Sequence, residues 1–224
     1  MLKRVLETEV MDTREEAVGY DTMDHSEVNR VFVGDFLAAA TEIGVDLDEQ
    51  TVIDLGTGTA QIPIELCQRH STVRVVAVDA ALHMLAVAKQ NITDAGLLDR
   101  ITLESVDAKG LTHADGTFQA VMSNSIVHHI PEPIDVLQQM WRVTASGGLI
   151  FIRDLMRPKD DATVTHLVDT YAADATDHQR QMLDDSLRAA LSLEEIRELV
   201  TEVGGIAETV VATSDRHWTW MAKK

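Results

Sequence analysis

Short apolar stretches alternate with segments of helical pattern along the chain, and this alternation limits the fold more than any other feature. The strand-like stretches lie at residues 51–55, 73–79, 101–107, 118–125 and 149–155. The helical patterns between them lie at residues 61–69, 81–92 and 131–143. Strands that are apolar on both faces and are joined by single helices are typical of a parallel sheet covered on both sides. The alternation therefore predicts an α/β, doubly wound fold.

The segments on either side of this core predict one domain over residues 1–224. Residues 1–45 predict an N-terminal arm followed by a helix. Residues 159–203 are helical in pattern and predict an insertion after the fifth strand, which we expect to cover the site as a lid. Residues 204–224 predict two closing strands, which complete a mostly parallel, seven-stranded, Rossmann-like sheet with helices on both faces.

Composition limits the partners and the location of the chain. Thirty-seven acidic residues against nineteen basic ones give a net charge of −18, which repels a phosphate backbone, so we expect no nucleic-acid partner. No apolar run approaches the ~20 residues of a membrane-spanning helix, and the first residues lack a signal-peptide pattern. Cys67 is the only cysteine, which excludes an internal disulfide. We therefore expect a cytoplasmic protein without a membrane partner.

The stretch "VIDLGTGTAQIPIEL", residues 52–66, runs from a strand through a glycine turn into a helix. Such a turn places backbone N–H groups at the carboxyl edge of the sheet, where open α/β sheets bind ligands. Gly56 and Gly58 permit positive φ and close approach of a ligand. A dinucleotide fingerprint needs a third glycine where Gln61 stands, and Asp54 would repel a pyrophosphate. A ligand with positive charge, such as the ammonium and sulfonium of S-adenosylmethionine, is favoured over a nicotinamide dinucleotide.

Carboxylates also end the next two strands. Asp79 ends the second strand and is suited to hold both ribose hydroxyls by charge-assisted hydrogen bonds. Asp107 ends the third strand and is suited to accept a hydrogen bond from an adenine amino group. A single aspartate at a strand end is usually a helix cap. Together with Asp54, however, three successive strand ends carry one, which indicates an adenosyl ligand.

Four motifs resemble those of a known family. They are "VIDLGTGTA", "VVAVDAALHMLAVAKQN", "ITLESVDA" and "MSNSIVHHIPEPIDVLQQMWRVTASGGLIFIRDLMRP". These motifs lie within residues 50–158 and resemble class I S-adenosylmethionine-dependent methyltransferases, of the small-molecule type related to ubiquinone/menaquinone-biosynthesis methyltransferases. The resemblance implies that residues 50–158 are the cofactor-binding core of an enzyme. It also implies that a methyl group passes from S-adenosylmethionine to a small-molecule substrate, with S-adenosylhomocysteine as the product.

The resemblance also implies roles for individual residues. Asp54, Gly56 and Gly58 match the positions at the methionine part of the cofactor. Asp79 matches the position at the ribose. The remaining match places Asp107 and the amide of Ala108 at the adenine.

Further positions are similar to the family pattern or depart from it. Met84 would lie against the adenine ring, and Tyr20 in "GYDTM" resembles a tyrosine that closes over the cofactor in some relatives. Ala60 replaces a glycine that is frequent in the turn, and Ala81 replaces a common serine after the ribose aspartate. Both replacements are small, so they leave room for the ligand.

The segment "SNSIVHHIP" follows the fourth strand, where we expect the methyl group to lie. Methyl transfer is an in-line displacement, in which the protein aligns the reactants and excludes water. Ser123 and Asn124 are therefore predicted at the cofactor. His128 and His129 are predicted catalytic residues, because an imidazole suits proton removal near neutral pH where the acceptor must lose a proton. The single cysteine excludes a cysteine-rich metal site, and two adjacent histidines alone do not complete a usual ligand set, so we expect no metal.

The segment "FIRDLMRP" ends the fifth strand at the same edge. Arg153 and Arg157 are predicted to bind an acidic or polar acceptor, and Asp154 is predicted to have a catalytic role. The alternative is a surface ion pair worth about 0–1 kcal/mol.

Two other functions remain open at this stage. One is a protein that binds S-adenosylmethionine without catalysis, and the other is a methyltransferase that acts on protein or RNA. The acceptor atom is not encoded in these motifs, because one scaffold serves many nucleophiles.

Overall fold

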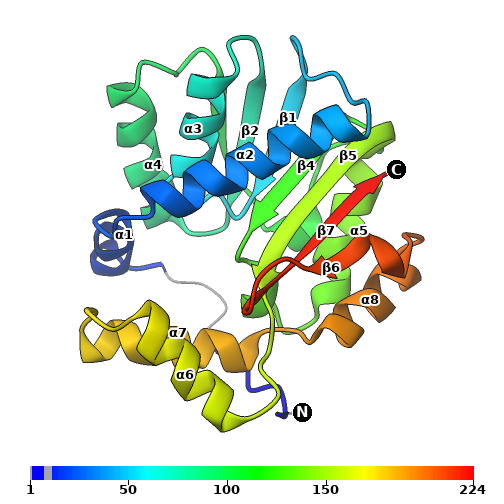
Figure 1. The fold of residues 1–224 in the computed structure, drawn as a ribbon. Helices are drawn as coiled ribbons and strands as arrows, with labels where there is room; N and C mark the ends of the chain where they lie inside the picture. Colours follow the sequence, from blue (N-terminus) through cyan, green and yellow to red (C-terminus); the bar gives the residue numbers. More distant parts are fainter. Residues whose placement is uncertain (1, 8–11) are drawn as a thin grey trace.

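The computed structural model describes residues 2–7 and 12–224. Seven strands form one sheet in the order β3-β2-β1-β4-β5-β7-β6 (Figure 1). The strands are β1 (Thr51–Leu55), β2 (Arg74–Asp79), β3 (Ile101–Ser105), β4 (Phe118–Asn124), β5 (Thr144–Leu155), β6 (Val210–Ala212) and β7 (His217–Lys223). The first five strands pair in parallel, whereas β7 is antiparallel to both β5 and β6. The predicted doubly wound, mostly parallel sheet is confirmed.

Helices cover both faces of the sheet. They are α1 (Arg14–Asp21), α2 (Ser26–Glu42), α3 (Gln61–Arg69), α4 (Leu82–Asp94), α5 (Pro133–Val143), α6 (Asp161–Tyr171), α7 (Asp177–Ala189) and α8 (Leu193–Glu202), with short 3-10 helices η1 (Ala108–Gly110), η2 (Val127–His129) and η3 (Ala207–Thr209). One face carries α2, α3 and α4, and the other carries α5 and α8 (Figure 1). Among the residues described, no helix has the length and apolar character needed to cross a membrane.

Neighbouring residues of β1 show why the strands are apolar on both faces. Val52 packs in the core that contains Phe36 of α2, and Ile53 packs in the opposite core, which contains Met140 of α5. All four side chains have at most 1% of their surface exposed. Burying one such side chain contributes about 1.5–3 kcal/mol. Packing on both faces of the central strands therefore holds their ligand-binding ends in place.

The start of β5 differs from the sequence prediction. The sequence places a break at Gly147 and Gly148, but the structure includes both glycines in a strand that begins at Thr144. The pairing register with β4 shifts at this point, and a Cβ atom on Gly148 would lie 2.7 Å from the carbonyl oxygen of Gln119. These glycines therefore permit a bulged, close pairing of two strands rather than a loop.

The pair α6 and α7 packs beyond the edge of the sheet, beside the first residues of the chain (Figure 1). Leu2 packs in the cluster that contains Leu167 and Leu187, and the Val5 N–H donates to the Arg188 carbonyl over 3.1 Å. The expected helical insertion after β5 is present. A lid role for it stays a prediction.

Candidate active site

A cavity of about 300 Å³ opens at the carboxyl ends of β1, β2 and β4, where the strand order reverses. This switch point is where open α/β sheets bind ligands, and the volume is at the lower end of the range for small-molecule sites. Most of the residues predicted at the cofactor line it: Tyr20, Gly56, Gly58, Asp79, Met84, Asp107, Ala108 and Asn124. Asp54 and Ser123 are buried and do not line the cavity.

The glycine turn forms one wall of the cavity. Gly56 has φ +73° and Gly58 has φ +56°, both in the left-handed region that favours glycine. A Cβ atom on Gly56 would lie 1.9 Å from Cγ2 of Ile126, whereas one on Gly58 would lie 3.7 Å from the Tyr20 ring. Gly56 is therefore required both by its conformation and by the close approach of Ile126, which also lines the cavity.

Asp79 ties the glycine turn to the beginning of α4. Its carboxylate accepts hydrogen bonds from the N–H of Gly58 over 2.7 Å and from the N–H of Ala81 over 2.8 Å. Burial raises the pKa of Asp79, and these N–H groups oppose that rise. The carboxylate is thus held in one orientation in the cavity wall, which suits the recognition of ligand hydroxyls.

Asp54 is buried at the end of β1, with 2% of its surface exposed. Burial raises its pKa to about 7, and the negative charge of Asp79 adds to the rise. Burial also raises the pKa of Tyr20, with further contributions from Asp54 and Asp79. The buried carboxylate of Asp54 and the half-buried carboxylate of Asp79 repel each other and favour a cation near them. This arrangement agrees with the positively charged ligand expected from the sequence.

The raised pKa of Asp54 predicts a pH dependence for ligand binding. The unfolded chain ionises Asp54 near its ordinary pKa of 3.8, so the empty protein loses free energy of unfolding as the pH rises from about 4 to about 7. A cationic ligand favours the ionised form, so binding below pH 7 releases a proton. The Kd for S-adenosylmethionine should therefore fall by up to about tenfold per pH unit between about pH 5.5 and 7. Calorimetric titration in buffers across that range measures this slope, and Asp54→Asn should abolish it.

The far end of the cavity is formed after β3. Asp107 caps η1 by accepting a hydrogen bond from the Lys109 N–H over 2.9 Å, and its carboxylate also pairs with the Lys109 ammonium at 3.1 Å. Met84, 5% exposed, lies in the wall with Ala108. An apolar surface beside hydrogen-bonding groups suits a heteroaromatic base.

The chain leaves β4 through a strained residue. Ser125 has φ +61°, which is uncommon for a residue with a side chain, and its N–H donates to the Arg153 carbonyl over 2.9 Å. Asn124 lines the cavity, whereas the Ser123 hydroxyl donates to the Leu55 carbonyl inside the sheet. Ser125 and Ile126 carry no distinctive sequence signal, and sequence reasoning missed both.

The two histidines after β4 occupy different environments. His129 lines the cavity, but His128 is only 3% exposed and does not. His128 Nδ1 lies 2.5 Å from an Asp154 oxygen, and the other oxygen accepts the Val127 N–H over 2.6 Å. Burial lowers the pKa of His128, but Asp154 and Glu7 outweigh it and leave that pKa raised. Asp154 therefore orients His128 and does not reach the cavity.

The two arginines of "FIRDLMRP" also separate. Arg153 lines a second cavity, described below, whereas Arg157 lines neither cavity. The Arg157 guanidinium is 2.5 Å from a carboxylate oxygen of Glu195 and donates to the Ala190 carbonyl over 3.0 Å. This pairing joins the segment after β5 to α8. The position of Arg157 gives no support to its predicted contact with an acceptor.

A family model described as a methyltransferase domain matches residues 52–148. That range contains the glycine turn and the strand ends that form the cavity. The chain carries an S-adenosylmethionine-dependent methyltransferase domain. The family model stops before the end of β5, so Arg153 and the segments after β5 lie outside the match.

Curated relatives of the methyltransferase domain match over about half of this chain. A demethylmenaquinone methyltransferase of Porphyromonas gingivalis is 33% identical over 109 residues, which are 48% of this chain and 44% of the relative. Methyltransferase GfsG of Streptomyces halstedii is 27% identical over 135 residues, 60% of this chain and 48% of the relative. Since the chain spans only about half the length of these relatives, the acceptor must be argued from the site itself.

Solved structures share the fold over nearly the whole chain. A SAM-dependent methyltransferase from Aquifex aeolicus has a TM-score of 0.66 at 17% identity, covering 95% of this chain and 98% of that chain. The plantazolicin methyltransferase BpumL has a TM-score of 0.72 at 13% identity, covering 94% of this chain and 90% of that chain. At these identities the likeness is one of fold. It extends through the helices after β5.

Proposed function

We propose that this methyltransferase domain transfers a methyl group from S-adenosylmethionine to a small polar molecule. The observation that carries the proposal is a second cavity, of about 660 Å³, which shares Asn124 and Ser125 with the cofactor cavity. The shared residues lie at the end of β4, where the methyl group is expected. An acceptor in the second cavity would therefore meet the cofactor at the strained Ser125.

The second cavity lies between α2 and the strands β5, β6 and β7, and it carries both signs of charge. Glu27, Asp35 and Glu42 lie on the α2 side, and Arg153 and Arg216 lie on the strand side. Such a lining suits a small polar acceptor better than an extended polymer. It favours neither RNA, which needs a basic surface, nor a purely apolar acceptor.

Arg153 is the most firmly held cation of this second cavity. Its guanidinium pairs with Asp35 at 2.7 Å and donates to the Thr219 hydroxyl over 3.0 Å. The rings of Phe32 and Phe151 lie 5.8 and 5.6 Å from its central carbon. Because these contacts fix the side chain in advance, little rotamer freedom is lost when it binds a carboxylate or another polar oxygen of an acceptor.

The residues of the cofactor cavity have a limited chemical task. When bound, S-adenosylmethionine supplies a methyl group on a positively charged sulfur. Asp79 would hold the hydroxyl groups of that ligand, and the charge of Asp54, buried behind the cavity wall, would favour its cationic groups. Tyr20 and Ile126 line the cavity and would help to exclude water. His129, which lines the cavity, is the better placed of the two histidines to take a proton from an acceptor.

Transfer of a labelled methyl group tests this proposal. The full chain is incubated with methyl-labelled S-adenosylmethionine and panels of small carboxylates, phenols, amines and thiols, or with protein or RNA. We expect label in a small molecule, and Arg153→Gln should raise the KM for that acceptor about tenfold while the Kd for the cofactor stays unchanged. Arg180→Gln, which breaks an arginine–aspartate pair away from both cavities, is the matched control.

Three results of this experiment would contradict the proposal. Label found only in protein or RNA would show that the acceptor is a polymer and not a small molecule. Cofactor binding without transfer to any class of acceptor would favour a protein that binds without catalysis. An unchanged KM in Arg153→Gln would remove the second cavity from the acceptor site.

A further inference from the structure

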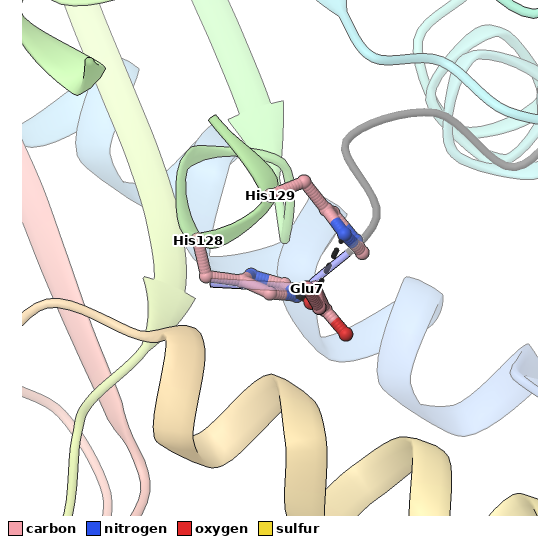
Figure 2. Close-up of side chains that lie close together, drawn as sticks. All are labelled: Glu7, His128 and His129. Carbon is pink, nitrogen blue, oxygen red and sulfur yellow. Dashed lines mark ion pairs between the residues drawn. The ribbon is translucent and has the colours of Figure 1, made fainter. Parts of the chain in front are cut away.

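Three side chains from distant parts of the chain meet beside the cofactor cavity (Figure 2). Glu7 comes from the N-terminal arm, and His128 and His129 come from η2. The Glu7 Oε1 atom lies 3.5 Å from His128 Nε2 and 3.0 Å from His129 Nδ1. Tetrahedral bonds of about 2.0–2.1 Å to one ion place neighbouring ligand atoms roughly 3.3–3.4 Å apart. The two separations from Glu7 are close to that spacing, and all three ligand atoms lie within 4.8 Å of one another.

A second carboxylate orients the buried histidine of this cluster. The His128 ring presents Nδ1 to Asp154 at 2.5 Å and therefore turns Nε2 toward Glu7. Asp154 is 1% exposed and is itself fixed by the N–H groups of Val127 and Leu155, each over 2.6 Å. Histidines that bind a metal almost always donate the other ring N–H to such a carboxylate or to a carbonyl. The outer partner expected around a metal ligand is thus already in place.

The N-terminal arm is held on the same loop as the histidines. The Arg4 guanidinium donates to the carbonyls of His128 over 3.1 Å and Ile130 over 2.9 Å. Oε2 of Glu7 accepts the Ser186 hydroxyl over 3.2 Å. One carboxylate oxygen is therefore satisfied by α7, and Oε1 is left to face the imidazoles.

Two buried atoms of the cluster lack hydrogen-bond partners among the residues described. They are Oε1 of Glu7 and Nδ1 of His129. These two atoms lie within ion-pair distance of each other, but their relative orientation does not make a hydrogen bond. Buried polar atoms are rarely left in this state, because desolvation without a partner carries a penalty. A ligand shared by both atoms would satisfy them together.

We propose that Glu7, His128 and His129 bind one divalent transition-metal ion, of the class that includes Zn²⁺. Two imidazole nitrogens and one carboxylate oxygen form a known ligand set for such ions, and three protein ligands leave a position open. Because His129 also lines the cofactor cavity, that position is expected beside the cavity and within reach of an oxygen or nitrogen of a bound molecule. With the ion bound, His129 would be a ligand and would not serve as the base named above. The sequence expectation of no metal did not consider Glu7, because that residue lies far from the histidines along the chain.

Zinc titration of the full chain, after treatment with a chelator, tests the site without cofactor or acceptor. We expect one equivalent of Zn²⁺ to bind by calorimetry and to raise the melting temperature. Loss of an outer partner typically raises the Kd for a metal ~10–100-fold, and we expect a rise in this range for Asp154→Asn. Glu7→Gln and His129→Asn each remove a ligand and should raise the Kd for Zn²⁺ by more than that. Glu104→Gln is the matched control, because Glu104 pairs with His113 at 3.3 Å outside the cluster.

Two results would overturn the metal site. One is the absence of saturable Zn²⁺ binding to the chelator-treated chain. The other is a Kd that stays the same in Glu7→Gln and His129→Asn as in Glu104→Gln. Both cluster variants alter side chains with about a fifth of their surface exposed, and melting without Zn²⁺ checks that they fold. The titration is independent of methyl transfer, so either proposal can fail while the other stands.

Discussion

Replacing Asp79 by Asn should weaken S-adenosylmethionine binding about 100-fold while the chain stays folded. The change removes the charge behind two hydrogen bonds to ribose hydroxyls, and a charge-assisted bond contributes about 1.5–3 kcal/mol. About 3 kcal/mol corresponds to roughly two powers of ten in Kd. Asn retains an oxygen that can accept the Gly58 N–H, so the turn keeps part of its support. Calorimetric titration with S-adenosylmethionine gives the Kd of both proteins.

The matched control for this prediction is Asp94→Asn at the end of α4. Asp94 accepts a hydrogen bond from Gln90 over 2.8 Å and lies outside both cavities. Its replacement removes one negative charge, as Asp79→Asn does, but at the opposite end of α4. The Kd should therefore not change. An equal Kd in Asp79→Asn and the unaltered protein would remove Asp79 from the ribose position.

Replacing Gly56 by Ala should lower the free energy of unfolding by about 2–5 kcal/mol. A residue with a side chain at φ +73° is strained by roughly 1–2 kcal/mol. The added Cβ atom would also lie 1.9 Å from Cγ2 of Ile126, and overpacking of this kind typically destabilises by about 1–3 kcal/mol. Denaturant unfolding of the purified proteins measures the difference.

Two further variants separate the strain from the clash at Gly56. Gly44→Ala is the matched control, because Gly44 has φ +68° but no atom within 4 Å of an added Cβ. It should therefore show only the conformational part of the loss. Combining Gly56→Ala with Ile126→Ala should recover the clash part. Equal losses in Gly44→Ala and Gly56→Ala would show that Ile126 yields freely and does not close the turn.

The cofactor side of the fold could be predicted because its signals are local. Apolar residues on both faces of β1 identify a buried strand, and Gly56 and Gly58 mark the turn that follows it. Asp79 ends β2 and Asp107 follows the neighbouring parallel strand β3, so the fold itself brings them to one edge. The strands and helices follow from apolar periods of two or 3.6 residues, which a sequence displays directly. The turn and the aspartates are then placed by their positions at the ends of these strands.

The rest of the site depends on contacts between distant segments, which no local pattern encodes. Glu7 reaches His128 and His129 only because the N-terminal arm packs on α7. Arg157 stands only four residues after Arg153, yet the approach of α8 pairs it with Glu195 instead of placing it in the second cavity. Long-range packing, not residue type, decides these roles.

The most direct test of the central claim is thermal melting of the full chain with four ligands in large excess. These ligands are S-adenosylmethionine, S-adenosylhomocysteine, NAD and NADP. A ligand at about 100 times its Kd adds roughly 2.7 kcal/mol, which raises the melting temperature of a domain of this size by about 5–10 °C. We expect this rise with S-adenosylmethionine and S-adenosylhomocysteine only, and its loss in Asp79→Asn. A rise with NAD or NADP, or with none of the four, would contradict the assignment of the cavity.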